Sequence, residues 1–145
     1  DLHRHILERR NLNETAEGVV VNLLDQKLWN QNPDFLSYTL SKAALQAATT
    51  MLALALAPQV RVVGVAPGIM EETGLRTIEY ETALAYTRGI TVEQLRAGYS
   101  KTSTIPLGRS GKLSEVADLC VYLASKRSSY VHGVTVNVAG GKTRG

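Results

Sequence analysis

A tyrosine and a lysine four residues apart are the side chains of this sequence best suited to acid–base chemistry. Tyr38 and Lys42 fall in an alanine-rich segment that predicts a helix, where residues at i and i+4 share one face. A free phenol, with a pKa near ~10, is a poor acid or base at neutral pH. An ammonium group beside it favours the phenolate and lowers that pKa, so the pair can act as a general acid or base. Alone, the spacing is weak evidence, because ordinary surface residues also show it.

An aspartate lies 13 positions before the tyrosine, since 38 − 25 = 13. Asp25 directly follows an apolar run and is therefore expected at the end of a strand, where ligands bind in open parallel sheets. A carboxylate near Tyr38 would oppose the phenolate and raise the tyrosine pKa, which favours a proton-donating role. The alternative is that Asp25 serves only as a turn residue after the strand.

Short apolar runs alternate with helical patterns along the chain. The first run, rich in β-branched residues and bounded by Gly18 and Asp25, is typical of a strand buried on both faces. The expected strands cover 18–24, 60–66 and 134–138. Strands that alternate with helices predict an α/β fold with a parallel sheet and βαβ crossovers.

The longest helix is expected from about Asp34 to Leu56, with Asp34 as its N-cap and Pro58 just past its end. A long excursion covers residues 69–108 and contains two weaker helical patterns. The remaining helices are expected near 1–12, 76–87, 92–99 and 114–124. The helix near 92–99 has Thr91 as its expected N-cap, followed by an acidic residue in its first turn.

Composition excludes several functional classes. The 145 residues are 44% apolar and 20% charged, which suits one domain with a real core. The net charge of +3 is spread without a basic run, so we expect no nucleic-acid surface. The single cysteine, Cys120, excludes a multi-cysteine zinc site, and the separated histidines give no convincing metal set. No run of ~20 apolar residues and no apolar leader is present, so we expect no membrane span and a cytoplasmic location.

Five motifs, taken in order and spacing, resemble those of the short-chain dehydrogenase/reductase family. They lie at 38–44 (YTLSKAA), 65–68 (VAPG), 106–109 (PLGR), 123–125 (LAS) and 130–141 (YVHGVTVNVAGG). The resemblance extends from about residue 18 to residue 141. It implies a doubly wound, Rossmann-like fold and hydride transfer with NAD or NADP, and this segment does not determine which.

The resemblance also implies roles for individual residues. Tyr38 would exchange a proton with a small-molecule substrate, and Lys42 would lower the tyrosine pKa and bind the nicotinamide ribose. The residues that would line the nicotinamide are Pro67, Gly68, Ile69 and Met70. The excursion would be the substrate loop, which excludes water. Members of the family commonly pair along the long helix, so a homo-oligomer through residues 35–57 is expected; the alternative is plain packing of this helix on its own sheet.

The sequence departs from the family pattern at the catalytic serine position, which Asp25 occupies. Pteridine reductases are similar here, and they imply that the acid and the tyrosine deliver protons to a pterin C=N bond. The excursion, with its segment 89–95, is more similar to carbonyl-reducing members. Glu72 and Ala139 also depart from common family residues without indicating a substrate.

The Gly-rich turn and helix with which the family holds the cofactor pyrophosphate are not found in this sequence. Residues 1–145 are therefore expected to form a single partial domain that lacks the N-terminal Gly-rich half. Two interpretations stay open: an oxidoreductase that reduces a carbonyl or a pterin-like C=N, or a truncated, inactive remnant that acts only through association. A three-stranded sheet would leave an unpaired edge, so the isolated chain is expected to be marginally stable or to associate.

Overall fold

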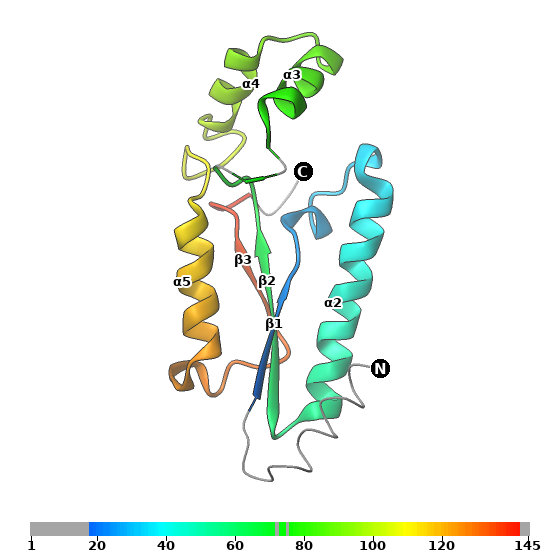
Figure 1. The fold of residues 1–145 in the computed structure, drawn as a ribbon, viewed down its shortest axis with the longest axis vertical. Helices are drawn as coiled ribbons and strands as arrows, with labels where there is room; N and C mark the ends of the chain where they lie inside the picture. The colour runs from blue at the N-terminus through cyan, green and yellow to red at the C-terminus, as the bar shows by residue number, and fades with distance from the viewer. Residues whose placement is uncertain (1–17, 72, 75, 143–145) are drawn as a thin grey trace.

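A computed structural model describes residues 18–71, 73–74 and 76–142, and it contains one parallel sheet. The strands are β1 (Gly18–Leu23), β2 (Val60–Pro67) and β3 (Thr135–Val138), paired in that order. Helix α2 (Leu36–Leu56) connects β1 to β2, and α5 (Leu113–Ala124) precedes β3. Figure 1 shows α2 and α5 on opposite sides of the sheet. The predicted α/β fold with parallel strands is therefore confirmed, whereas the helix end expected at 1–12 lies outside the described residues.

The alternation of side chains along β2 builds two apolar layers. Val62 faces α2 and packs in a cluster with Ala53 and Leu56. Val63 and Val65 face the other way and pack against Leu123 of α5. All three valines are fully buried, as expected for the central strand of a sheet covered on both faces.

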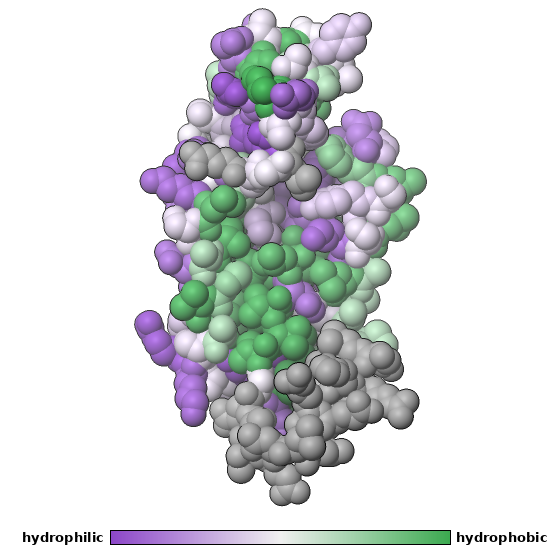
Figure 2. All heavy atoms as spheres, viewed as in Figure 1, coloured by the Kyte–Doolittle hydropathy of each residue, from purple (hydrophilic) through white to green (hydrophobic). Residues whose placement is uncertain are grey.

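Strand β1 is less buried than its sequence predicts. Its residues are only partly buried, and the Leu23 side chain is exposed. The prediction of a strand buried on both faces is wrong because β1 pairs with β2 on one side only, at the edge of the described sheet. Figure 2 shows hydrophobic side chains gathered across the middle of the face on which β1 lies in front.

The long helix begins two residues later than predicted, and Asp34 is not its N-cap. A 3₁₀ turn, η2 (Pro33–Phe35), precedes α2, and the Asn32 side chain accepts a hydrogen bond from the Asp34 backbone N–H at 3.0 Å. Asn32 therefore caps the turn. Pro33, the first residue of the turn, has a restricted backbone that suits a turn. The chain therefore begins to coil at Pro33, one residue before Asp34, while the α-helix itself begins at Leu36.

The excursion contains two short helices, α3 (Ile78–Thr87) and α4 (Val92–Tyr99), close to where the sequence predicts them. Thr91 caps α4 reciprocally, because its hydroxyl accepts from the Gln94 N–H and the Gln94 side chain accepts from the Thr91 N–H. Residues 76–99 are called the α3–α4 segment below, and Figure 1 shows it beyond the carboxyl end of β2. In the part of the chain that the structure describes, no helix is long and apolar enough to cross a membrane.

Candidate active site

The carboxyl end of β1 brings Asp25 and Tyr38 together. The Tyr38 hydroxyl, at the start of α2, donates to Asp25 Oδ2 at 2.6 Å. The other carboxylate oxygen accepts from the backbone N–H of Lys27 at 2.7 Å, which caps the 3₁₀ turn η1 (Gln26–Leu28). Asp25 is therefore both the turn residue and the partner of the tyrosine. With both oxygens engaged, the carboxylate is held in one orientation against the phenol.

The environment of Tyr38 strengthens its hold on its proton. Partial burial raises the pKa of the phenol, and the hydrogen bond and negative charge of Asp25 raise it further. The phenol is therefore protonated at neutral pH. The pKa of Tyr38 is therefore raised overall, with Asp25 among the causes as expected, and not lowered as the lysine spacing alone predicts.

Lys42 reaches the strand rather than the phenol. Its Nζ donates to the Leu23 carbonyl oxygen at 2.8 Å and lies 5.7 Å from the centroid of the Tyr38 ring. The two side chains therefore share a face of α2 as predicted, but a backbone acceptor draws the ammonium group away from the hydroxyl. An ammonium group has three N–H donors, so this contact leaves donors for a ligand.

The predicted nicotinamide-lining residues begin at the last residue of β2, Pro67, and continue into the loop at the same edge of the sheet. Leu23 pairs with Val65 in the β1–β2 register, and Asp25 and Pro67 each lie two residues further on. The Gly68 N–H donates to the Val138 carbonyl oxygen at 2.9 Å. A Cβ on Gly68 would lie 2.8 Å from that of Ala139, so the close approach of β3 already requires glycine here.

The rest of this loop is fastened to the segment before α5. The Gly111 N–H donates to the Ile69 carbonyl oxygen at 2.9 Å, and Gly111 forms a parallel bridge with Met70. Behind the loop lies a cavity of about 290 Å³, bordered by Ile69 and Met70 on one side and by the end of β3 on the other. Tyr38 and Asp25 do not line it, so this cavity is not where the proton transfer would occur.

One group of charged residues escaped the sequence reasoning. Glu81 is 4% exposed, although glutamate is almost never fully buried without a partner. The available signal was an acid in the middle of a short helix with arginines at 76 and 96 in the same excursion. Within the described ranges, no three His, Cys, Asp or Glu side chains are grouped in a way that could hold a metal ion.

Comparisons with known proteins agree on one family. A family model described as enoyl-(acyl carrier protein) reductase matches residues 4–143. Sorbitol-6-phosphate 2-dehydrogenase of Klebsiella pneumoniae is 54% identical over 137 residues, which cover 94% of this chain and 51% of that protein. A 3-oxoacyl-[acyl-carrier-protein] reductase of Thermotoga maritima is 33% identical over 141 residues, covering 94% and 48%. The chain thus spans about half the length of the curated relatives it matches.

Solved structures give the same result. A short chain dehydrogenase family protein from Francisella tularensis superposes with a TM-score of 0.75 at 28% identity, covering 86% of this chain and 50% of that one. FolM alternative dihydrofolate reductase 1 from Brucella canis, complexed with NADP, gives 0.67 at 33% identity, covering 93% and 46%.

Proposed function

The chain belongs to the short-chain dehydrogenase/reductase family, and we propose that its protein uses NADH or NADPH to reduce a carbonyl or a pterin-like C=N bond. The observation that carries this proposal is the 2.6 Å hydrogen bond from Tyr38 to Asp25. A phenol kept protonated at neutral pH carries a proton that a substrate can take, which is what a reduction requires. The inactive-remnant alternative is not favoured, because the curated relatives that match the chain are named as oxidoreductases.

The donor set at this end of the sheet fits the nicotinamide and ribose end of a dinucleotide. Lys42 has N–H donors left for ribose hydroxyls after its bond to Leu23, and the backbone of 67–70 would line the nicotinamide. The cofactor, when bound, supplies the hydride that reduces the substrate carbon. The substrate oxygen or nitrogen takes the hydroxyl proton of Tyr38, which leaves a phenolate. The Asp25 carboxylate opposes that negative charge and so favours return of a proton from solvent.

Two substrate classes follow from the relatives and from Asp25. The Brucella canis structure is titled an alternative dihydrofolate reductase, and an aspartate beside the tyrosine supports a pterin-like C=N substrate. The Klebsiella relative, named for sorbitol 6-phosphate, supports a carbonyl substrate. Asp25→Ser separates them. If the substrate is a pterin, dihydropterin reduction falls while simple carbonyl reduction survives; equal loss of both would contradict the pterin assignment.

The decisive experiment is Tyr38→Phe in the protein that carries this chain. Removal of a general acid is expected to lower kcat by about 10²–10⁴-fold while cofactor affinity stays nearly unchanged. Reduction of a dihydropterin and oxidation of sorbitol 6-phosphate would be followed by nicotinamide absorbance, and cofactor binding by titration. Tyr130→Phe, at a fully exposed tyrosine, is the matched control. Unchanged turnover in Tyr38→Phe would refute the assignment.

The outer face of α2 supports a second proposal, that two copies of the chain pair along this helix. A stripe at helical spacing is exposed, and it is entirely apolar. Its members are Leu36, Leu40, Ala43, Ala47, Met51 and Leu54. Apolar stripes of this length are rare on monomers, and one along a helix is self-complementary about a twofold axis. Sedimentation velocity of the intact protein and of Leu54→Glu tests this pairing. A monomer in both cases would contradict it.

A further inference from the structure

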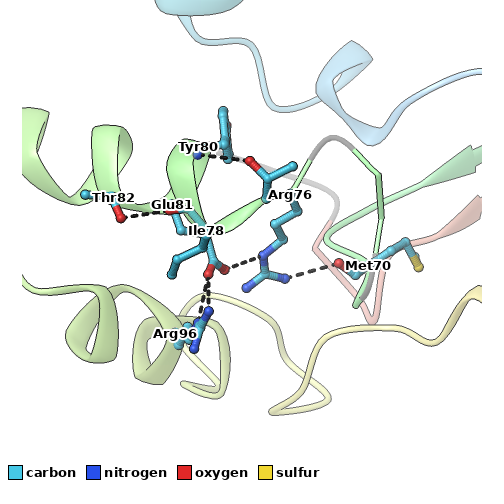
Figure 3. Close-up of polar contacts among 8 residues, drawn as sticks. Met70, Arg76, Ile78, Tyr80, Glu81, Thr82 and Arg96 are labelled. Atoms are coloured by element: carbon cyan, nitrogen blue, oxygen red, sulfur yellow. Dashed lines mark hydrogen bonds and ion pairs between the residues drawn. The ribbon is translucent and has the colours of Figure 1, made fainter.

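The α3–α4 segment is organised around one buried carboxylate. Glu81 Oε1 accepts from Arg76 Nε at 2.9 Å, and Oε2 accepts from Arg96 Nε at 2.8 Å (Figure 3). Glu81 belongs to α3, Arg96 to α4, and Arg76 precedes both helices. The two ion pairs lower the pKa of Glu81 against the opposing effect of burial. A buried carboxylate with a separate arginine on each oxygen therefore fixes the two helices to each other.

Arg76 also reaches outside this segment. Its Nη1 donates to the Met70 carbonyl oxygen at 3.1 Å, and its guanidinium carbon lies 4.2 Å from the centroid of the Tyr99 ring. The Arg76 side chain is 17% exposed, so these contacts lie mostly out of water. One guanidinium thus joins α3, the end of α4, and the loop 67–70 that the proposed function places at the nicotinamide.

Arg96 provides a natural comparison. It pairs with the same carboxylate, and its side chain is 57% exposed. Within the described part of the chain, it makes no hydrogen bond or ion pair with the loop 67–70. Two arginines therefore share one acid, but only Arg76 is bonded to the loop.

We propose that Arg76 is a positioning residue, which sets the α3–α4 segment against the loop 67–70 and so holds the substrate side and the cofactor side of the site in one arrangement. Its planar fork donates to a carboxylate and to a carbonyl oxygen at once while its face stacks on a ring, which a lysine ammonium cannot do. The effect on turnover rests on the proposed function; the effect on the segment does not.

The kinetic test compares Arg76→Met, Arg76→Lys and Arg96→Met in the protein that carries this chain. We expect Arg76→Met to raise KM for the substrate about tenfold or more while kcat changes by less than about threefold, because binding geometry is lost rather than proton transfer. Arg76→Lys should not restore KM, and Arg96→Met should change KM by less than about threefold. Restoration by lysine would show that charge alone matters and would overturn the proposal.

A second readout needs no activity. Limited proteolysis within residues 76–108 should be about tenfold faster in Arg76→Met than in the unaltered protein. The acceleration in Arg96→Met should be clearly smaller, because Arg76 still pairs with Glu81 and still donates to the Met70 carbonyl oxygen. Equal acceleration in both variants would mean that the buried acid, and not the bond to Met70, holds the segment, and would overturn the proposal. If the protein proves not to be an oxidoreductase, the proteolysis result still supports or overturns the positioning role.

Discussion

The sheet with its covering helices α2 and α5, called the sheet layer below, and the α3–α4 segment are held together by different forces. In the sheet layer, Val63, Val65 and Leu123 are almost completely buried, and apolar contact on both faces of β2 dominates. In the α3–α4 segment the buried side chains are Ala85, Leu95 and the charged Glu81. Apolar burial is non-directional and insensitive to pH, whereas an ion pair depends on geometry and on titration.

The difference separates two tasks within one site. Asp25 follows β1 and Tyr38 lies in the first turn of α2, so the sheet layer positions both residues of the proposed reacting pair. The α3–α4 segment sits beyond the carboxyl end of the same sheet (Figure 1), and the Arg76 guanidinium bonds it to the Met70 carbonyl oxygen in the loop after β2. Segments that must move to admit a substrate are drawn from the less stable parts of a fold. Under the proposed function, the sheet layer would position the reacting pair and the α3–α4 segment would cover the substrate.

The largest expected effect comes from a cavity in the sheet layer. Leu123→Ala removes a side chain that is 1% exposed and should lower the free energy of unfolding by about 2–5 kcal/mol. Val121→Ala on the same helix, at a side chain that is 70% exposed, should change it by less than about 0.5 kcal/mol. Denaturant unfolding of the intact protein measures both. Similar values for the two variants would show that α5 does not carry the core.

A smaller and local effect is expected when Glu81 is replaced. Its folded pKa lies below its ordinary value of 4.5, so the ion pairs stabilise the folded segment above that pH and are lost as the pH falls through the lowered pKa. Protection of residues 76–108 from an acid-active protease should therefore weaken with acid. In Glu81→Gln it should be weak at every pH.

The control for Glu81→Gln is Glu79→Gln, which removes an exposed carboxylate from the same helix. Its protection should keep the acid dependence of the unaltered protein. Global unfolding of Glu81→Gln should change less than that of Leu123→Ala, because the sheet layer does not use this pair. A global loss as large as that of Leu123→Ala would mean that the two regions unfold as one unit.

The sequence predicted most of the fold and the spacing of the site, for reasons that are local. A β-branched run ending at Asp25 and a helix that starts near Tyr38 suffice to bring the two side chains to one edge. The hydrogen-bond partner of Lys42 depends on the direction of the Leu23 carbonyl group, which residue spacing does not predict. The burial of Glu81 depends on how two short helices pack. Asp34 is not the predicted cap, because Asn32 caps a 3₁₀ turn that starts at Pro33 and α2 begins only at Leu36.

The smallest expected effect tests whether burial is what distinguishes the ion pairs. Arg109 holds Glu115 with two hydrogen bonds, at 2.9 and 2.6 Å, a geometry as favourable as that around Glu81. Their side chains are 49% and 40% exposed, however, so water screens the pair and competes for both groups. Arg109→Met should therefore leave the melting temperature of the intact protein unchanged, since Glu115 still accepts from the Lys112 N–H. If Arg109→Met instead lowered the melting temperature measurably, pair geometry rather than burial would decide the strength of these contacts. The contrast between an apolar sheet layer and a charge-held segment would then lose its physical basis.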